Sequence, residues 1–570
     1  MTVGAIPPRV DAVDKVTGLA TYPADLVPKN ALHAVVVFTN QPHARLVKLD
    51  LAETLAAPGV VTVVTAADVP VNEYGLTLFD QPVFIGLDDT GRSSVPCNVS
   101  RWEADHLVVV VAESLIEARQ ASALIRTEWE QLPMASDVVA ARTDETLVHP
   151  GSTSNTYHEL KIRKGDIEKG IAAADVIIEG TYELPHQEHA YLQVEAATAW
   201  IDDEGLVTVE TGGQWIHEDR EQIAHALDID PEEVRVRYAA IGGAFGGKED
   251  MSLQIVMAVT ARKLAKSGNK RSVHCGWSRE ESIVGHHKRH RATVHARLGA
   301  TTQGIITAVE ADVWLDAGAY NYTSNKVLGN LHLSVAGAYE VPNARIDSKA
   351  IYTHSVPGGA FRGFGGPQGA FVAESQMNKL AEALGIDPLE LRRQNALTDV
   401  SAGITQAGLP EGVGVVRVID ACAERAPTSE EPAAGKPFRP IASLPAEMGQ
   451  LRQGRGYAVG MKNVGFSFGF PEACEADVIF HGEPEDERPI RVELLHSAAE
   501  VGQGVHTALI QMVADAANVD SKQIEATFSD TATGGDSGSA SASRLTFMAG
   551  NSILGAVEEA EKTWADGDRP

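Results

Sequence analysis

A glycine-rich segment between a predicted strand and a predicted helix constrains the fold of this chain more than any other feature. Residues 242–250 read Gly-Gly-Ala-Phe-Gly-Gly-Lys-Glu-Asp. Residues 234–238 alternate apolar and charged side chains, which predicts a strand, and residues 253–264 have apolar side chains at helical spacing. Glycines let a backbone adopt positive φ and approach a ligand, and the N-terminus of a helix attracts anions. The segment therefore predicts a ligand-binding loop in a strand–loop–helix unit.

A nucleotide-binding loop is the first alternative for this segment. Residues 242–248 fit the pattern G-x-x-x-x-G-K, but Glu249 stands where such loops need a serine or threonine to bind magnesium. An acidic side chain there would also repel phosphate. A glycine turn with a purely structural role is the second alternative.

Composition and charge exclude several classes of protein. The 570 residues are enough for two to four domains, and the net charge of −29 disfavours nucleic acids and anionic membranes as partners. No apolar run is long enough to span a membrane and no secretory signal is visible, so we expect a cytoplasmic protein. The four cysteines are far apart, which argues against disulfides and against an iron–sulfur cluster held by this chain.

An internal repeat is the most informative pattern. Residues 214–217 read Gln-x-x-His and open a predicted helix, which is followed by the strand at 234–236 and by a Gly-Gly pair. Residues 503–506 begin the same order, which continues through a helix, the strand 524–528, a Gly-Gly pair and the small-residue loop 537–543. The spacings agree to within two residues. Such a repeat predicts two related half-domains that face each other with a ligand between them, although chance similarity remains the alternative.

Two further segments stand out between the repeats. Residues 360–368 form a third glycine loop with Arg362 inside it, before a predicted helix whose apolar face includes Phe371 and Val372. An arginine there suits the binding of an anionic or oxo group, or it is simply exposed in a structural turn. Residues 186–189, His-Gln-Glu-His, offer two imidazoles, but with no third ligand nearby in sequence we favour a structural role over a metal site.

Together these motifs resemble a known family. The chain is similar to the molybdopterin-binding subunit of the xanthine dehydrogenase and aldehyde oxidase family of molybdenum hydroxylases. The motifs that carry the resemblance are GGAFGGKE at 242–249, AFRGFGGPQ at 360–368, VGQGVHT at 501–507 and GSASAS at 538–543, with support from 9–18, 187–192 and 462–472.

The resemblance implies an α+β fold in several parts. An N-terminal α/β hammerhead domain is expected before a two-half molybdopterin-binding region with an internal pseudo-repeat. The expected parts are an N-terminal arm at 1–17, the hammerhead domain at 18–133, the first half at 136–425, a proline-rich linker at 426–455, and the C-terminally incomplete second half at 456–570.

The resemblance also implies a cofactor site. Gln214 and Arg362 would lie at the catalytic centre, with Phe245 and Ala542 also beside the metal. The expected cofactor-binding residues are Gln214, Gly243, Phe245, Gly246, Arg362, Gly502, Gln503, Gly504, Ala542 and Ser543. The implied cofactor is molybdenum–molybdopterin, with the cytosine dinucleotide as one form that it can take.

The substrate residues match the family in part. Glu249 matches an acid that binds a purine, and Phe364 and Phe468 match two aromatics that hold a flat ring. Asn330 stands where the family has an arginine, which alters the charge opposite the acid. We therefore expect oxidative hydroxylation of an electron-poor carbon in a nitrogen heterocycle, with water as the oxygen source, and aldehyde oxidation as the second choice.

The resemblance also implies partner chains. No residue of this chain can be assigned as the family's catalytic glutamate, so we expect another chain carrying the remaining C-terminal part to supply it. The alternative is a truncated, non-catalytic scaffold. Electrons would leave through partner subunits with 2Fe-2S clusters and FAD.

Overall fold

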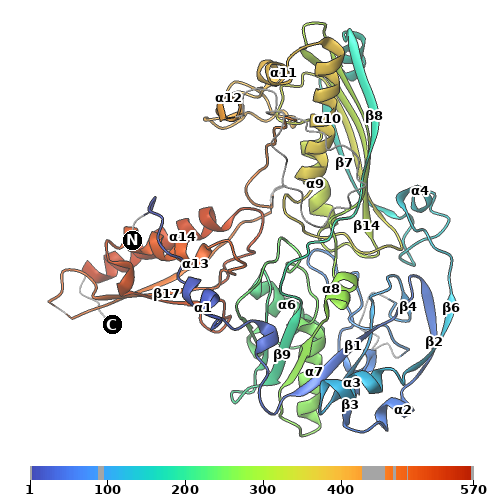
Figure 1. The fold of residues 1–570 in the computed structure, drawn as a ribbon, viewed down its shortest axis with the longest axis vertical. Coiled ribbons are helices and arrows are strands. Elements are labelled where there is room, and N and C mark those ends of the chain that lie inside the picture. The colour runs from blue at the N-terminus through green and yellow to red at the C-terminus, as the bar shows by residue number, and fades with distance from the viewer. Residues whose placement is uncertain (1–2, 88–95, 426–455, 467–469, 484, 566–570) are drawn as a thin grey trace, which may run out of the picture.

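The computed structural model describes residues 3–87, 96–425, 456–466, 470–483 and 485–565, which form three lobes (Figure 1). The predicted linker at 426–455 and Phe468 lie outside the described residues. We call the lobes N-terminal, middle and C-terminal. No helix in the described ranges has the length and hydropathy needed to cross a membrane.

The N-terminal lobe is built on a seven-stranded mixed sheet. Its strand order is β11 (Val234–Tyr238), β10 (Val207–Thr211), β9 (Ala196–Ile201), β12 (Val273–Gly276), β1 (Leu32–Phe38), β5 (His106–Ala112) and β3 (Val60–Val64). Strands from before residue 133 and from after residue 195 thus share one sheet. A smaller sheet in the order β4 (Val99–Ser100), β2 (Ala44–Asp50), β6 (Arg126–Gln131) lies beside it.

Buried apolar runs explain the interior position of β5, between β1 and the edge strand β3, and the helices that cover the sheet. Every residue of β5 is buried, because β1 and β3 flank it and helices cover its faces. The helix α7 (Gln254–Lys266), predicted over 253–264, packs on β9, β10 and β12. The other helical segments of this lobe are α2 (Ala52–Leu55), η2 (Ala66–Asp68), α3 (Leu115–Ser122), α6 (Ile216–Leu227), η3 (Pro231–Glu233) and α8 (Arg279–Gly285).

The middle lobe is a five-stranded sheet covered by two long helices. The sheet order is β7 (Thr156–Lys164), β15 (Ala344–Tyr352), β14 (Ile306–Gly318), β13 (Ala292–Ala300) and β8 (Val176–Leu184). The helices α9 (Ser324–Ser334) and α10 (Gly366–Leu384) pack against it. Shorter helices are α4 (Val138–Ala141), α5 (Ile167–Ala172), α11 (Pro388–Asn395) and α12 (Val415–Arg425).

One detail of α10 differs from the sequence prediction. The helix starts at the Gly-Pro pair, as its sequence predicts, and ends at the left-handed Gly385. Val372 is buried, but its neighbour Phe371 is 52% exposed and meets the Tyr182 ring edge to face, with centroids 6.2 Å apart. The sequence prediction that Phe371 belongs to the buried apolar face of this helix is therefore wrong, because its side chain turns outward to solvent.

The C-terminal lobe repeats a unit of the N-terminal lobe. Its sheet has the order β16 (Asp477–His481), β17 (Arg491–His496), β18 (Ile524–Phe528), and α13 (Val505–Ala516), η4 (Ser521–Gln523) and α14 (Leu545–Ala565) complete it. In both lobes an antiparallel pair is followed by a helix, a 3-10 turn and a parallel third strand. The helices lead into left-handed Asp228 and Asn518, and capping boxes at Asp230 and Asp520 start the two turns. The internal repeat predicted from the sequence is thus confirmed.

The N-terminal arm crosses to the C-terminal lobe (Figure 1). It contains the helix α1 (Ala12–Thr17), and the turn η1 (Pro23–Asp25) follows it. Arg9 forms an ion pair with Glu500 at 3.1 Å and donates a hydrogen bond to the Gly502 carbonyl at 2.6 Å. Val13 and Val16 of α1 are 66% and 84% exposed. The first residues of the chain therefore help to fix the loop before α13.

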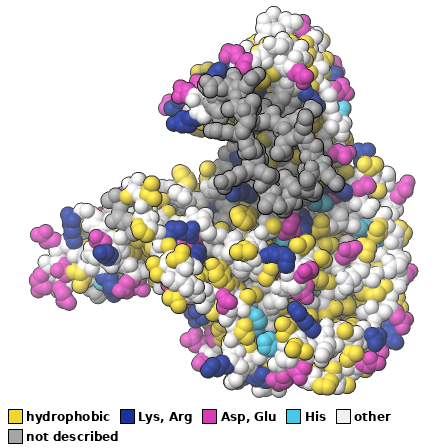
Figure 2. Space-filling view, viewed as in Figure 1, with side chains coloured by type: hydrophobic (Ala, Val, Ile, Leu, Met, Phe, Trp, Pro, Cys, Tyr) yellow, Lys and Arg dark blue, Asp and Glu magenta, His cyan; other side chains and the backbone are white. Residues whose placement is uncertain are grey.

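The charged side chains are mixed on the face that Figure 2 shows. Lys and Arg side chains of the described residues are scattered among Asp and Glu side chains over all three lobes, and acidic side chains gather at the far end of the C-terminal lobe (Figure 2). A protein that binds a nucleic-acid backbone collects its basic side chains on one surface. The distribution on this face agrees with the expectation drawn from the net charge of −29.

A buried carboxyl group on α6 gives the fold a pH-dependent stability. Asp219 is 1% exposed and accepts hydrogen bonds from the Tyr238 hydroxyl at 2.8 Å and the Gln254 amide at 3.2 Å. Burial raises the pKa of Asp219 from its ordinary value of 3.8 to about 7, against the effect of these hydrogen bonds. Because the unfolded chain ionises first, the free energy of unfolding falls as the pH rises from about 4 to about 7. This group alone contributes up to about 1.4 kcal/mol per pH unit.

The variant Asp219→Asn tests this contribution, because its amide oxygen can still accept from Tyr238. We expect urea unfolding of the variant to depend less on pH than that of the wild type between about pH 4 and about pH 7. Parallel pH profiles of the two proteins would show that Asp219 ionises normally in the fold.

Candidate functional site

Loops from all three lobes meet around the side chain of Gln214. This side chain is 3% exposed, and its Oε1 accepts hydrogen bonds from the backbone N–H groups of Gly246 at 3.1 Å and Lys248 at 3.3 Å. Its Nε2 donates to the Ala540 carbonyl at 3.0 Å, and the Ala540 N–H donates to the Gln214 carbonyl at 2.7 Å. Gln214 thus joins the loop at 242–250 to the loop at 537–543.

The loop at 360–366 closes against the first loop. The N–H of Arg362 donates to the Phe245 carbonyl at 2.9 Å. A Cβ on Gly246, where φ is +101°, would lie 2.7 Å from the Ala360 carbonyl oxygen. Only glycine allows both this backbone conformation and this close approach. The two loops are therefore fixed to each other at the backbone level.

Several residues other than glycine have left-handed backbones in these loops. Phe245 has φ of 56°, Phe364 of 48°, Ala542 of 51° and Ser543 of 56°. Such conformations cost free energy in a residue with a side chain and gather at ligand-binding sites. Phe245 is also 45% exposed, although its loop is otherwise largely buried. Four of the residues expected at the site are thus held in unusual geometry.

Glu249 is buried between the N-terminal and C-terminal lobes. One carboxylate oxygen accepts hydrogen bonds from the hydroxyl groups of Ser539 at 2.9 Å and Ser541 at 2.6 Å. The other oxygen is buried without a hydrogen-bond partner among the described residues. Burial raises the pKa of Glu249, against the effect of the two serine hydrogen bonds. No local pattern in the sequence predicts that these two serines hold the acid.

Aromatic side chains lie next to this acid-bearing loop. Phe364 is 8% exposed and its ring meets that of Phe466 edge to face, with centroids 6.4 Å apart. Phe466 in turn stacks on Trp215 at 5.9 Å and contacts Phe470 at 5.1 Å. The N–H of Gly465 donates to the Ala542 carbonyl at 3.0 Å. The residues on both sides of the segment that contains Phe468 are thus anchored beside the site.

Asn330 and Arg362 offer hydrogen-bond donors that the described residues do not use. Asn330 on α9 is 2% exposed, and its Nδ2 is buried without a partner in the described part of the chain. The loop of Arg362 packs on this helix, since a Cβ on Gly365 would lie 2.3 Å from the Val327 carbonyl oxygen. The Arg362 guanidinium is exposed and makes no hydrogen bond or ion pair to any residue in the described ranges. The Arg362 guanidinium is therefore accessible to a ligand, and the Asn330 Nδ2 is a buried donor that the described residues leave unpaired.

The loop at 501–504 is more exposed than the loops around Gln214. Gln503 is exposed, and its amide bonds within its own loop, to the Ala499 carbonyl at 2.9 Å and the Val501 N–H at 2.7 Å. Gly502 and Gly504 have φ of 114° and 90°, and no described atom lies within 4 Å of an added Cβ on either. The backbone here is open to a ligand. In the described residues, Gln503 makes no hydrogen bond to the loops around Gln214.

Lys248 does not point at a phosphate site. Its Nζ donates to the carbonyl and side-chain oxygens of Gln193 at 3.0 and 2.9 Å and lies 4.5 Å from the centre of the Tyr191 ring. Burial lowers its pKa to about 7. The lysine of a nucleotide-binding loop must reach the phosphates instead. The position of Lys248 therefore argues against a nucleotide-binding loop at 242–248.

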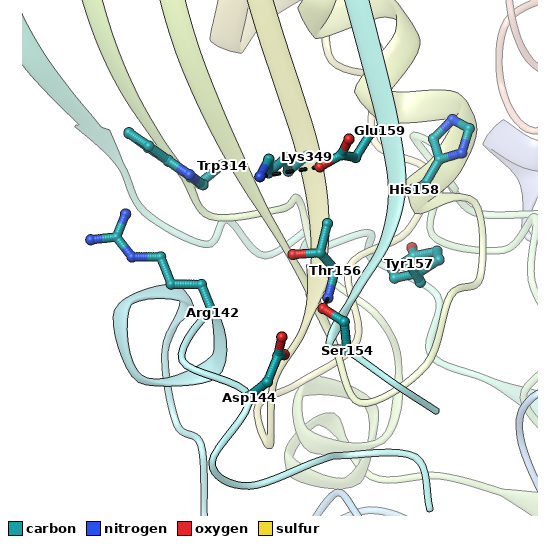
Figure 3. Close-up of a pocket in the computed structure, with 9 residues that line it drawn as sticks. All are labelled: Arg142, Asp144, Ser154, Thr156, Tyr157, His158, Glu159, Trp314 and Lys349. Carbon is teal, nitrogen blue, oxygen red and sulfur yellow. Dashed lines mark hydrogen bonds and ion pairs between the residues drawn. The ribbon is translucent and has the colours of Figure 1, made fainter. Parts of the chain in front are cut away.

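A cavity of about 420 Å³ lies elsewhere, in the middle lobe (Figure 3). Its walls come from the segment 142–159 and from β14 and β15. Lys349 forms an ion pair with Glu159 at 3.1 Å, and the Arg142 guanidinium lies 5.2 Å from the centre of the Trp314 ring. The glycine loops do not contribute to this cavity.

The loops around Gln214 fit a molybdopterin cofactor in the chemistry that they offer. They present glycine backbone in left-handed conformations, free donors on Arg362, and hydroxyl groups on the loop at 537–543. Such amide-rich loops bind the polar edges and phosphate groups of a cofactor.

Comparison with known families assigns three segments. Residues 17–133 match the family described as aldehyde oxidase and xanthine dehydrogenase, a/b hammerhead domain. Residues 148–396 and 438–566 match two families that are both described as molybdopterin cofactor-binding domain. The hammerhead fold and the two-part cofactor-binding region predicted from the sequence are thus confirmed.

Individual relatives agree with this assignment. The chain is 32% identical over 547 residues to a probable xanthine dehydrogenase subunit of Bacillus subtilis, covering 96% of this chain and 68% of that protein. It is 34% identical over 420 residues to the nicotinate dehydrogenase large molybdopterin subunit of Eubacterium barkeri, covering 73% of this chain and 95% of that protein.

A solved structure gives the same result. The aldehyde oxidoreductase of Desulfovibrio desulfuricans superposes with a TM-score of 0.85 at 26% identity, covering all of this chain and 63% of that enzyme. The chain therefore spans less than two thirds of that enzyme. It belongs to the xanthine dehydrogenase and aldehyde oxidoreductase family of molybdopterin-binding oxidoreductase chains.

Proposed function

We propose that this chain binds the molybdenum cofactor of a hydroxylase that oxidises an electron-poor carbon in a nitrogen heterocycle, with water as the oxygen source. The observation that carries the choice of a heterocycle is a pair of unused polar atoms. Among the described residues, Glu249 keeps one buried oxygen without a partner, and Asn330 keeps a buried N–H group without one. A ring with both acceptor and donor atoms could satisfy both, and buried polar groups rarely stay unpaired.

The residues of this chain have distinct proposed roles. The backbone of Gly243, Phe245, Gly246, Ala542 and Ser543 would cradle the cofactor beside Gln214, and Gly502, Gln503 and Gly504 would bind its pterin part. When bound, the cofactor supplies Lewis acidity and accepts the electrons. Arg362 would stabilise negative charge that develops near the metal.

The substrate would be oriented by side chains on both sides of its ring. Phe364 and Phe468 would hold its faces. Glu249 would face a polar atom of the ring with its unpartnered carboxylate oxygen, and burial raises the pKa of this carboxyl group. Asn330 would add a neutral donor.

We further propose that other chains complete the enzyme. A catalytic glutamate would come from a chain that carries the remaining part of the fold, and partner subunits with 2Fe-2S clusters and FAD would take the electrons. A relative supports this proposal. The Eubacterium barkeri protein, of which 95% aligns with this chain, is itself named a large molybdopterin subunit, which implies that it works with other subunits. The cytosine dinucleotide form of the cofactor and a cytoplasmic location belong to the same proposal.

Aldehyde oxidation is the second candidate, since the chain is 30% identical over 578 residues to the aldehyde oxidoreductase of Megalodesulfovibrio gigas. A scaffold without activity is the third. The native complex distinguishes them through its molybdenum and pterin content, the masses of co-purifying chains, and turnover of heterocycles and aldehydes with an artificial electron acceptor. Protein that stays free of metal with no companion chain would contradict the proposal.

The variant Asn330→Leu separates the two substrate classes. We expect kcat/KM for the preferred heterocycle to fall by about 10- to 100-fold, because the ring loses a buried hydrogen bond. Turnover of a simple aldehyde by the same preparation is the internal control and should change much less. Equal losses for both substrates would show that Asn330 maintains the structure of the site and does not bind the substrate ring.

A further inference from the structure

Behind the cofactor loops, three side chains converge that the proposed function does not use. Glu188 and His189 lie in the segment between β8 and β9, and His286 follows α8. The Nε2 of His286 lies 3.1 Å from the Glu188 Oε1 and 3.3 Å from the His189 Nδ1, and the three atoms all lie within 4.8 Å of one another. His189 and His286 are buried, while Glu188 is partly exposed. From here on these three residues are called the His–Glu cluster.

The hydrogen bonds around the His–Glu cluster leave lone pairs pointing at its centre. The Nε2 of His189 lies 2.7 Å from the Ala360 carbonyl oxygen and so carries a hydrogen. The Nδ1 of His286 contacts the Ser282 carbonyl oxygen and also carries one. In neutral rings the two remaining nitrogens are therefore acceptors, and a carboxylate oxygen faces them. Three acceptors at this distance repel each other unless a positive charge lies among them.

The surroundings match those of metal-binding histidines. Such histidines donate their far N–H group to a backbone carbonyl or carboxylate, and metal-binding carboxylates are themselves hydrogen-bonded. Here both histidines donate to carbonyls, the Ala190 N–H donates to the Glu188 Oε1 at 3.0 Å, and the Glu188 Oε2 forms an ion pair with Lys288 at 2.9 Å. Lys288 thereby fixes the carboxylate with its other oxygen toward the two rings.

The distances suit a small tetrahedral cation. Zinc binds histidine nitrogen and carboxylate oxygen at about 2.0–2.2 Å, so two ligand atoms on a tetrahedron lie roughly 3.3 Å apart. The observed separations of 3.1 and 3.3 Å are close to this value. Two imidazoles and one carboxylate form a donor set that zinc and similar first-row metals prefer over magnesium or calcium. Three protein ligands leave one position for water.

We propose that the His–Glu cluster is a binding site for one divalent first-row metal ion such as Zn²⁺, separate from the molybdenum cofactor. Its position gives it an effect on the loops above. His189 holds the Ala360 carbonyl, and a Cβ on Gly247 would lie 2.8 Å from the His189 ring. A metal ion there would fix the loops at 242–250 and 360–366 against each other. The partly exposed Glu188 lies on the side of the cluster from which an ion can enter.

Metal titration of the full chain tests this proposal independently of turnover. After treatment with a chelator, wild-type protein should bind one equivalent of Zn²⁺, and Co²⁺ should give the intense visible absorption of a tetrahedral site. Thermal unfolding should shift upward with Zn²⁺. A wild-type protein that binds no Zn²⁺ and shows no Co²⁺ spectrum would overturn the proposal.

Three variants sharpen the test. His286→Gln and Glu188→Gln should each weaken Zn²⁺ binding by more than the roughly 10- to 100-fold loss that is typical of an outer hydrogen-bonding partner, and Lys288→Gln should fall within that range. His186→Gln is the matched control, since His186 belongs to the same segment but its ring faces the Arg289 carbonyl at 3.2 Å. Unchanged Zn²⁺ affinity in His286→Gln would overturn the proposal. If that variant does not fold, the wild-type titration alone decides.

Discussion

Replacing Gln214 with alanine is expected to destabilise the chain by about 2–4 kcal/mol and to release the cofactor. The substitution leaves the N–H groups of Gly246 and Lys248 and the carbonyl of Ala540 without their side-chain partner. Each buried polar group that loses its partner costs about 1–3 kcal/mol, reduced here wherever water can enter. Because these bonds join loops from two lobes, their loss loosens the site as well as the fold.

The repeat supplies a matched control for this substitution. Gln503 holds the corresponding place in the C-terminal lobe, but its side chain is exposed and bonds only within the loop at 499–503 in the described structure. Gln503→Ala should therefore change the free energy of unfolding by less than about 1 kcal/mol. Urea unfolding of both variants makes the comparison of stability, and the molybdenum content of Gln214→Ala is compared with that of the wild type. Equal stability losses would show that the bonds of Gln214 do not hold the lobes together.

The contrast between the two glutamines also shows what a repeat in sequence can predict. The order of helix, turn and strand is the same in both lobes because caps and apolar runs are local signals, and the capping boxes at Asp230 and Asp520 reproduce each other. The contacts made by the two glutamines differ, because they depend on which loop from another lobe lies opposite. The sequence contains no local signal for that.

The contacts that the sequence did not predict at the site join residues that are far apart in the chain. The loops at 242–250, 360–368 and 537–543 were recognised by their glycines and small residues, and the structure brings them together. Their connections were not predicted: Ser539 and Ser541 hold Glu249, and they are 290 and 292 residues away from it. His286 likewise joins His189 across 97 residues, so the segment at 186–189 looked too poor in ligands when considered alone.

The pairing of strands in the N-terminal lobe was likewise not predictable from the sequence. The apolar runs at 60–64 and 107–111 form the strands β3 and β5, of which only β5 is buried throughout. Neither run indicates that its strand belongs to the same sheet as β12 and β9 from after residue 195. Parallel pairing of β1 with β12 joins Leu32 to Val273, and no periodicity encodes a contact between positions so far apart.

The second large effect is expected at Arg544, whose replacement by leucine should cost about 3–5 kcal/mol and disorder the loop at 537–543. Arg544 is 1% exposed and forms an ion pair with Glu472 at 2.5 Å. It also donates to the Ser537 carbonyl at 2.7 Å and to the Ala473 carbonyl. Removing one member of a buried ion pair leaves the other charge without compensation, which is the costly case. Because the loop carries the serines that hold Glu249, cofactor retention should fall as well.

An exposed ion pair in the same lobe provides the control for Arg544. Arg491 pairs with Glu525 at 2.8 Å, but both side chains are well exposed, at 38% and 68%. Arg491→Leu should therefore cost less than about 1 kcal/mol, since water screens such pairs. Urea unfolding measures the two losses, and limited proteolysis locates the opened segment. If Arg544→Leu were as mild as Arg491→Leu, the loop at 537–543 would keep its shape through its own turns and its contacts with Gln214, and the ion pair with Glu472 would not determine it.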